Sequence, residues 1–307
     1  MTETEIAIVG GGPAGLQAAL VLARTRKRIV VFDSPESPRN AASHGVHNFL
    51  GLDDLLPEQI RERAWKQIDR YGSARLESQA VLAITRQREH GPFTLETGAG
   101  TWEARHVLLA CGYHDAYPEL DGFADCWGGT IIICPFCDGY ENRDRRWGIV
   151  AAAAEELEAF PEMVQNWTSE RLLVAAPELE VSPEREAELA AQGVALHRGP
   201  VSALIHDRGE LSAVELRGEE TVEVGTLLWK PEERPAPLIA ALVAGLGLEL
   251  DEHGYVAVDD SQRTNVDRLW AAGDVQGWTG AIQSANLGGL AAIMIAHGWY
   301  RGGGAVD

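Results

Sequence analysis

Apolar runs alternate with amphipathic stretches along this 307-residue chain, in an order that predicts an α/β protein. Near the start, an apolar strand from Glu5 to Val9 leads through a glycine-rich turn into a helix from about Ala14 to Arg24. The next apolar segment, "RIVVFD", predicts a strand that ends at Asp33. Together these elements predict a β-α-β unit of the dinucleotide-binding kind.

Further along, alternation in "PFTLETG" and "TWEARHVLLA" predicts a strand meander that returns to a buried strand, His106 to Ala110. The stretch from Tyr113 to Pro118 predicts a loop, and a second α/β segment extends from there to about Lys230. A proline-rich, charged link follows, from Lys230 to Leu238. Two such linkers predict that one domain is inserted into another.

The C-terminal part returns to a helix, a hairpin and a buried strand that ends at Gly273 and Asp274, before a last helix from Ser284 to Trp299. The predicted fold is therefore α/β, with two Rossmann-like three-layer nucleotide-binding domains. We expect residues 1–114 and 236–307 to form the first domain, and residues 115–235 to form the inserted one.

Composition and charge narrow the possible partners. The formal net charge is -20, which repels phosphate backbones and makes nucleic acid an unexpected partner. No run approaches eighteen apolar residues, so we predict no membrane span. The first residues, "MTETEIAIVGGG", resemble neither a signal nor a transit peptide, which favours a cytoplasmic location.

The first glycine turn carries the pattern G-x-G-x-x-G at Gly10, Gly12 and Gly15. These positions allow a tight turn, close approach of a pyrophosphate to a helix N-terminus, and close packing of the helix on the strand. Asp33, at the end of the second strand, can accept a hydrogen bond from a ribose hydroxyl. The turn therefore predicts nucleotide binding; the alternative is a glycine-rich turn that serves packing alone.

A pair of cysteines, Cys134 and Cys137, follows the apolar segment "TIIIC" at the expected start of a helix. A thiolate at a helix N-terminus is stabilised by the dipole and by free N–H groups, and two thiols at this spacing can close a disulfide. The alternatives are a buried apolar pair and half of a metal site. We found no further two ligands and expect no metal. Cys111 and Cys126 are expected to be packing residues.

Three segments together resemble the low-molecular-weight thioredoxin reductase family of FAD-dependent disulfide oxidoreductases. They are "HNFLG" (47–51), "CPFCDG" (134–139) and "TNVDRLWAAGDV" (264–275). The resemblance implies an FAD cofactor and a homodimer. It also implies that Cys137 exchanges electrons with the flavin, that Cys134 reacts with a partner disulfide, and that Asp138 serves the thiols as proton donor and acceptor.

The cofactor contacts that we predict from the glycine turn and from this resemblance lie in several segments. They are Gly10, Gly12, Pro13, Ala14, Gly15, Asp33, Asn40, His47, Asn48, Val81, Gly112, Gly273, Asp274 and Ile282.

A second glycine fingerprint, which grips NADPH in conventional members, is expected about a dozen residues after the cysteine pair. Here the strand "WGIV" is followed by four alanines, Ala151 to Ala154, and by Glu155 and Glu156. A Cβ hinders close approach of a pyrophosphate, and each carboxylate would repel a phosphate charge by roughly 3 kcal/mol at about 6 Å. The stretch "LLVAAPELEVSPE" contains no basic residue for a 2′-phosphate. The pattern indicates the subgroup that lacks the NADPH-binding motifs; the alternative is a divergent grip on the same cofactor.

The resulting prediction is a flavoprotein disulfide reductase of the thioredoxin reductase type whose electron donor is not NADPH. Ferredoxin is one candidate donor, and the partner is a thioredoxin-like protein or a small-molecule disulfide or dithiol. One alternative is a dithiol oxidase that passes electrons through FAD to oxygen, a branch that "DSPESPRNAASHGVHNFLG" resembles. Asp138 favours the reductase, because the oxidase branch usually has histidine there. A second alternative is a flavin redox sensor without turnover.

Overall fold

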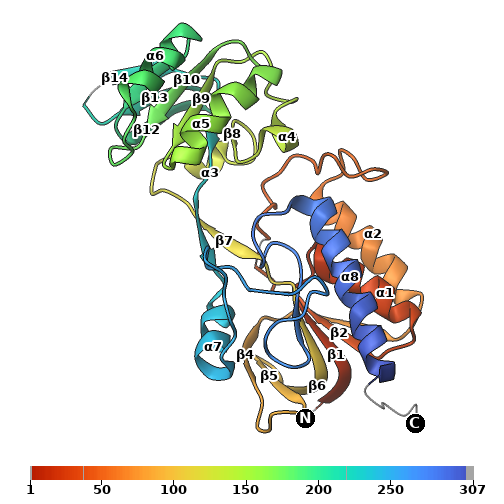
Figure 1. Cartoon of the computed structure of the whole chain (residues 1–307). Coiled ribbons are helices and arrows are strands. Elements are labelled where there is room, and N and C mark those ends of the chain that lie inside the picture. The colour runs from red at the N-terminus through yellow and green to blue at the C-terminus, as the bar shows by residue number, and fades with distance from the viewer. Residues whose placement is uncertain (1, 37, 219, 302–307) are drawn as a thin grey trace. The chain divides into compact units, whose positions relative to one another are not determined.

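The computed structural model describes residues 2–36, 38–218 and 220–301 (Figure 1). Contacts between residues divide the chain into two compact units. Unit 1 comprises Met1–Ala41, Leu55–His114 and Glu233–Asp307, and unit 2 comprises Ala42–Asp54 and Asp115–Glu232. The domain boundaries at 114/115 and 235/236 stay a prediction, and the short segment Ala42–Asp54 groups with unit 2.

Unit 1 is built on a sheet with the strand order β3-β2-β1-β6-β5-β4, in which β17 also pairs with β6 (Figure 1). The strands β1, β2, β3, β6 and β17 are parallel, whereas β4, β5 and β6 form the antiparallel meander that the alternating pattern predicted. The bounds are β1 Thr2–Val9, β2 Ile29–Phe32, β3 Ala74–Glu77, β4 Val81–Thr85, β5 Phe93–Thr97, β6 Gly100–Leu109 and β17 Leu269–Ala271.

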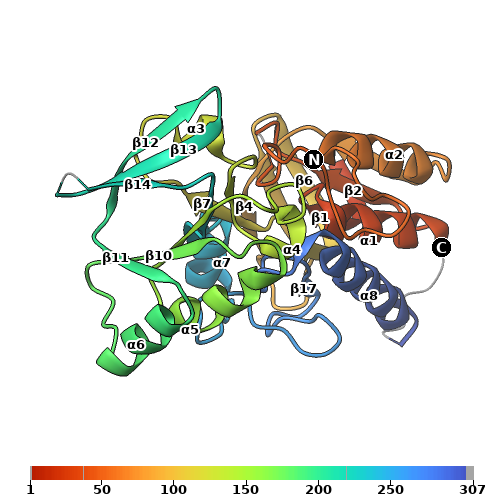
Figure 2. The same cartoon turned by 90° about the horizontal axis from the view of Figure 1, so that it is seen from above.

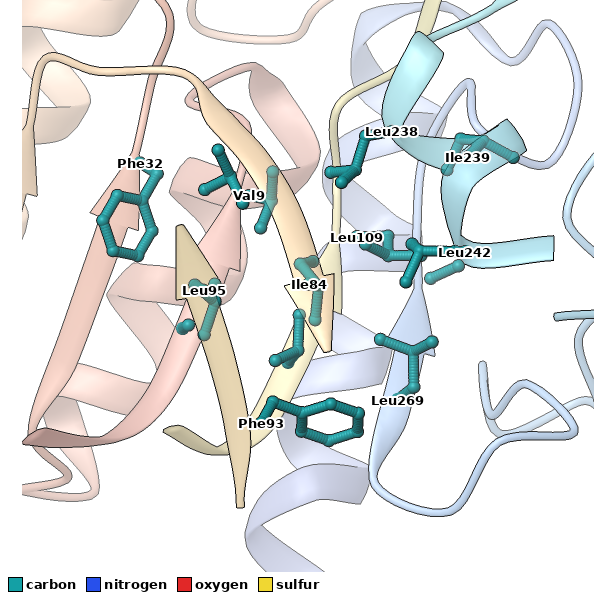
Figure 3. Packing of buried hydrophobic residues seen from close by; sticks show 14 of the residues in the cluster. Val9, Phe32, Ile84, Phe93, Leu95, Leu109, Leu238, Ile239, Leu242 and Leu269 are labelled. Atoms are coloured by element: carbon teal, nitrogen blue, oxygen red, sulfur yellow. The ribbon is translucent and has the colours of Figure 1, made fainter. Parts of the chain in front are cut away.

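Helices cover one face of this sheet. Helix α1 (Pro13–Arg24) packs on α8 (Gly280–Arg301), and α2 (Pro57–Asp69) lies beside α1 (Figure 2). Small side chains allow this close packing, since the face of α1 that is buried against β1 and α8 is rich in alanine. The opposite face of the sheet carries a second apolar cluster that includes Phe32, Phe93 and Leu109, together with helix α7 (Pro237–Leu246) (Figure 3).

Unit 2 has three layers. A five-stranded parallel sheet, β11-β10-β9-β15-β8, lies between helices α5 (Ala154–Met163) and α6 (Pro183–Ala191) and a three-stranded antiparallel sheet, β12-β13-β14 (Figure 2). The bounds are β8 Ile131–Ile132, β9 Trp147–Ala151, β10 Arg171–Ala175, β11 Ala195–Arg198, β12 Val201–Asp207, β13 Glu210–Leu216, β14 Glu220–Glu223 and β15 Thr226–Trp229. The short helices are α3 Phe123–Cys126, α4 Pro135–Asp138 and the 3₁₀ turn η1 Val164–Asn166.

The α/β prediction is confirmed, because both units have Rossmann-type sheets. Three local predictions were wrong. The expected loop after β6 contains a strand, β7 (Tyr113–Ala116), which pairs with β16 (Glu232–Pro235) inside the expected link. Proline is tolerated in such a two-stranded ribbon because every strand there is an edge. The expected hairpin after α7 is reduced to one bridge, Leu250 to Val256, and α8 begins at Gly280 rather than at Ser284.

Within the described ranges, none of the helices combines the length and the apolar character needed to cross a membrane.

Candidate nucleotide and redox sites

The predicted nucleotide residues of unit 1 meet at one edge of its sheet. Gly10 follows β1, Asp33 follows β2, Gly112 lies shortly after β6, and Gly273 and Asp274 follow β17. Because these strands are parallel, their carboxyl ends lie at the same edge. Gly112 and Asp274 are neighbours at this edge, since a Cβ built on Gly112 would lie 4.0 Å from the Cβ of Asp274.

The turn between β1 and α1 needs glycine at two positions and offers space at a third. Gly10 has φ of +114°, and a Cβ there would lie 2.1 Å from the Ala110 carbonyl oxygen. At Gly15 a Cβ would lie 1.9 Å from the Gly10 oxygen, whereas at Gly12 nothing lies within 4 Å. Gly12 is the N-cap of α1, whose first turn holds no acidic side chain. The turn thus presents the N-terminus of α1 to an open space that a pyrophosphate fits.

Two carboxylates frame this edge, and both are held by neighbours. The backbone N–H of Gly11 donates to Asp33 Oδ1 at 2.9 Å, and Arg61 pairs with Asp33 Oδ2. The Asp274 Oδ1 accepts from the Thr279 hydroxyl at 2.8 Å and from the Ser284 hydroxyl at 3.1 Å. These contacts fix the orientation of both acids, as a ribose or ribityl chain would require.

Sequence reasoning missed the residues that hold these carboxylates. Arg61 lies on α2, 28 residues after Asp33, and no short-range spacing rule connects the two. Arg39 lies 3.6 Å from Asp274 Oδ2 and 2.5 Å from a carboxylate oxygen of Glu233. Of these partners, Thr279 is the one that the sequence could have indicated, because a threonine five residues after an aspartate can fold back and donate to it.

The remaining predicted cofactor contacts fall in different surroundings. Pro13 and Ala14 form the first turn of α1, and Ile282 lies near the start of α8 with about half of its surface exposed (48%). Val81 begins β4 and is buried in the apolar cluster of unit 1. Asn40 follows Arg39 in the same turn. For each of these residues, the contact with the cofactor stays a prediction.

His47 and Asn48 belong to the segment Ala42–Asp54, and within unit 2 they contact the cysteine turn. The His47 Nδ1 lies 2.7 Å from the carbonyl oxygen of Cys137, and the Asn48 side-chain amide donates to the carbonyl oxygen of Phe136 at 2.6 Å. Their predicted role as cofactor contacts is not tested by these hydrogen bonds.

The short helix α4 follows β8; Cys134 precedes its first residue and Cys137 lies within it. Cys134 is the N-cap and is buried, whereas Cys137 is partly exposed, and both are thiols in this structure. The Cys134 carbonyl accepts from the backbone N–H groups of Cys137 and Asp138, at 3.1 and 3.2 Å. The prediction that this pair opens a helix is therefore confirmed, although the helix is a single turn.

The thiols differ in acidity because they share a hydrogen bond. The Cys137 thiol donates to Cys134, and the N–H groups of Cys137 and Phe136 also point at the Cys134 sulfur, so the pKa of Cys134 is lowered. Hydrogen bonding to Cys134 and burial raise the pKa of Cys137. A lowered pKa at Cys134 and a raised pKa at Cys137 suit the predicted role of Cys134 as the nucleophile.

The carboxyl of Asp138 has a raised pKa, as its predicted role in proton transfer would require. Burial raises the pKa of its carboxyl from 3.8 to about 6, with a further upward contribution from Glu141, while His47 acts in the opposite direction. For His47, burial favours a lower pKa, but the Cys137 carbonyl and the carboxylates of Glu141, Asp138 and Asp53 outweigh it and raise the pKa. A group that titrates near pH 6 can both accept and return a thiol proton.

The turn between β9 and α5 contains a carboxylate instead of open space. The Glu156 Oε2 accepts from the backbone N–H of Ala152 at 2.8 Å and from that of Ala153 at 3.1 Å. Ala153 is the N-cap of α5, and the first turn carries both Glu155 and Glu156. The N–H groups that a dinucleotide phosphate would use here already bind an anion of the chain itself.

The two other cysteines pack in apolar surroundings, as predicted. Cys126 is fully buried in the cluster beneath the antiparallel sheet of unit 2. Cys111 packs against the large apolar cluster of unit 1, and burial raises the pKa of its thiol to about 11. Neither residue is set up for thiolate chemistry.

Comparison with known proteins agrees with this geometry. The model of the pyridine nucleotide-disulphide oxidoreductase family matches residues 4–292. The thioredoxin reductase aclD of Aspergillus oryzae is 32% identical over 300 residues, which cover 94% of each chain. The thioredoxin reductase tcpT of Claviceps purpurea is 40% identical over a shorter stretch, 47% of this chain and 45% of its own.

Two solved structures resemble the whole chain. A putative thioredoxin reductase TrxB from Bacillus anthracis superposes with a TM-score of 0.88 at 29% identity, over 97% of this chain and 99% of its own. HlmI superposes with a TM-score of 0.89 at 29% identity, over 98% and 95% of the two chains. Fold and site together define a thioredoxin reductase-like flavoprotein oxidoreductase that binds FAD. The chain belongs to the pyridine nucleotide-disulphide oxidoreductase family.

Proposed function

We propose that this protein is a disulfide reductase of the thioredoxin reductase type that takes its electrons from a donor other than NADPH. The observation that carries the proposal is the Glu156 carboxylate, bound to the N–H groups of Ala152 and Ala153. A phosphate at this turn would have to displace that carboxylate and then remain beside it and beside the exposed Glu155. At about 6 Å and an effective dielectric constant near 20, each such repulsion amounts to about 3 kcal/mol.

Two arginines of unit 2 that could approach a phosphate are already paired with carboxylates. Arg198, at the carboxyl end of β11, pairs with Glu186. Arg185, on α6, is buried and pairs with Glu158 and Glu188. A 2′-phosphate would have to compete with these glutamates for either guanidinium.

The chemistry at the cysteines follows from their unequal acidity. The Cys134 thiolate attacks a disulfide of the partner, which gives a mixed disulfide and releases one partner thiolate. Cys137 then loses its proton to Asp138 and attacks the Cys134 sulfur, which releases the second partner thiolate and leaves the Cys134–Cys137 disulfide. Asp138 returns the proton to a leaving thiolate. FAD, when bound, supplies the two electrons that reduce this disulfide again.

The partner that we propose is a thioredoxin-like protein or a small-molecule disulfide, since aclD and tcpT are named thioredoxin reductases. Ferredoxin is the candidate donor. Because this chain has a net charge of -20, a ferredoxin, itself acidic, must bind at a local basic patch. Reduction by ferredoxin should therefore slow steeply at low ionic strength if no such patch exists. We also propose a cytoplasmic homodimer, as the family resemblance implies.

An anaerobic titration of the bound flavin tests the proposal. NADPH and NADH should leave the flavin absorbance unchanged over minutes, whereas dithiothreitol should bleach it through the cysteine pair. Fast, stoichiometric bleaching by NADPH would contradict the proposal. As a control, Cys137→Ser should keep FAD but lose bleaching by dithiothreitol.

The same experiment separates the reductase from the dithiol oxidase. Air is admitted after the flavin has been reduced. Slow return of the yellow absorbance, together with reduction by ferredoxin, supports the reductase. Rapid return of the yellow absorbance, at a rate proportional to the oxygen concentration, would contradict the reductase. It would instead assign the protein as an oxidase that runs the same thiol–disulfide exchange steps in reverse.

A further inference from the structure

The redox turn, Cys134–Gly139, accepts hydrogen bonds from the loop Ala42–Asp54, which precedes it by some 85 residues. Helix α4 is only four residues long, so its last carbonyl groups depend on partners beyond the helix. The Pro135 carbonyl accepts from the backbone N–H of Gly139 at 2.8 Å, and that of Asp138 accepts from the Asn142 side chain at 3.0 Å. The two carbonyls between them, those of Phe136 and Cys137, accept from Asn48 and His47.

The loop that presents these two side chains is closed by its own hydrogen bonds. The backbone N–H of Asp54 donates to the Val46 carbonyl at 3.0 Å, and the N–H of Asn48 donates to Asp53 Oδ1 at 2.8 Å. Asn48 has a positive φ of 61°, a conformation that asparagine tolerates better than most residues. This backbone directs two consecutive side chains to two consecutive carbonyls of α4.

The hydrogen bond to Cys137 determines which nitrogen of His47 can titrate. A carbonyl oxygen only accepts, so Nδ1 must carry a proton in both charge states of the ring. The exchangeable site is therefore Nε2, which faces Asp54 Oδ1 at 3.6 Å and Glu141 Oε1 at 3.7 Å. Four carboxylates act on the His47 ring. Asp53 and Asp54 come from its own loop, and Asp138 and Glu141 come from the segment of the redox turn.

We propose that His47 is a positioning residue of the redox turn, which holds the Cys137 carbonyl through Nδ1 and, by gaining or losing a proton at Nε2, changes the charge beside the thiols and Asp138. The inference rests on the proposed function, since it assigns a part in thiol chemistry to this residue. The Asp138 carboxylate opposes ionisation of Cys134, and with Nε2 protonated the imidazolium offsets the charge of that carboxylate. Asn48 shares the holding of the turn but carries no charge.

The test compares thiol acidity in three variants of the reduced protein. Pulses of iodoacetamide are applied from pH 5 to pH 9, and alkylation of the peptide with Cys134 and Cys137 is quantified by mass spectrometry. His47→Gln keeps an N–H donor for the carbonyl but removes the charge, so the alkylation midpoint should rise by about half to one pH unit. Asn48→Ala should leave the midpoint in place and accelerate alkylation at every pH, because the turn opens more often.

The matched control is His44→Gln, in the same loop. His44 lies against Gly129, since a Cβ built on Gly129 would lie 3.6 Å from its Cε1. The control should reproduce the wild-type midpoint. If His47→Gln has the same midpoint as this control, the proposal is wrong.

A second measurement uses the wild-type protein, in case His47→Gln does not fold. Coupling is reciprocal, so a histidine that senses the thiolate must titrate at a higher pH in the dithiol form than in the disulfide form. Among the nine histidines of ¹⁵N-histidine-labelled protein, one should show this difference. If no histidine shows it, the proposal fails. Neither measurement uses an electron donor. A negative result therefore does not bear on the proposal about NADPH, which the flavin titration tests separately.

Discussion

The chain contains two strand–turn–helix units, β1–α1 and β9–α5, and each starts from a central strand that has parallel neighbours on both sides. In the first, the N-cap is Gly12, with open space around it and no acid in the first turn of the helix. In the second, the N-cap is Ala153 and the Glu156 carboxylate binds the N–H groups of the turn. The same topology therefore accompanies two opposite electrostatic situations at a helix N-terminus.

This difference separates what a Rossmann-type fold requires from what nucleotide binding requires. A helix N-terminus leaves N–H groups without partners and attracts negative charge in either case. When the chain supplies the carboxylate itself, as Glu156 does, the fold stays intact and no cofactor is needed to satisfy these groups. When the chain supplies only glycine, the phosphate of a ligand is the natural partner. Under the proposed function, local capping rather than topology determines which of the two sheets binds a nucleotide.

The largest expected effect comes from making the first turn resemble the second. Gly12→Asp would place a carboxylate where the FAD pyrophosphate is expected, at a position with room for a side chain. We expect FAD affinity to fall by about 100-fold or more, equivalent to about 3 kcal/mol, as measured by flavin fluorescence during titration of the apoprotein.

The fold itself should tolerate this change, because aspartate is preferred over glycine at an N-cap. Gly98→Asp adds the same charge at an exposed turn of unit 1 and should bind FAD as the wild type does. If Gly12→Asp retains wild-type affinity, Gly12 does not line the pyrophosphate site.

A medium effect, on the pH dependence of stability, is expected at Asp138. This residue lies beside the cysteine pair of unit 2, the unit in which Glu156 caps the turn before α5. Burial raises the pKa of this carboxyl to about 6, so its contribution to stability is present below pH 3.8 and is lost as the pH rises through about 6. Asp138→Asn removes that loss. Relative to wild type, the free energy of unfolding of the variant should be about 2 kcal/mol higher at pH 8 than at pH 4.

Urea unfolding at the two pH values measures the difference. An equal effect of Asp138→Asn at both pH values would show that the carboxyl titrates normally, and it would remove the support for proton transfer by this residue near neutral pH.

The smallest effect is expected from removing the internal cap. Glu156→Ala takes away the acceptor for two N–H groups and should destabilise the protein by about 1 kcal/mol, a typical cost of losing a helix cap. Glu155→Ala, at the neighbouring exposed position, should change the stability by less than about 0.5 kcal/mol. Thermal or urea unfolding would distinguish them, and equal effects would mean that Glu156 is not a cap in solution.

Much of this arrangement could be predicted from the sequence where the signal is local. The spacing of Gly10, Gly12 and Gly15 between an apolar strand and a helix was sufficient to place β1 and α1. The replacement of glycine by Ala151–Ala154 with two following glutamates indicated a changed second turn. Backbone requirements for glycine act over a few residues, so a single sequence expresses them clearly.

The parts that escaped prediction depend on contacts between distant segments. The sequence indicated repulsion by Glu156, but its capping of the backbone appeared only with the side-chain conformation. The contact of His47 with Cys137 spans 90 residues, and that of Arg61 with Asp33 spans 28. Strand β7 was missed because it gains its hydrogen bonds from β16, more than a hundred residues later. Periodicity carries no information about such partners.

The packing of α8 on α1 has a consequence for the order of events during synthesis. The glycine turn and α1 are synthesised before β17, Asp274 and α8, on which the completed unit depends. The apolar face of α1 therefore stays uncovered while more than two hundred and fifty residues are translated, and unit 2 can fold before unit 1 is complete. Incorporation of FAD must consequently wait until Asp274 and α8 have been synthesised, and until then the apolar face of α1 is the surface that would benefit from a chaperone.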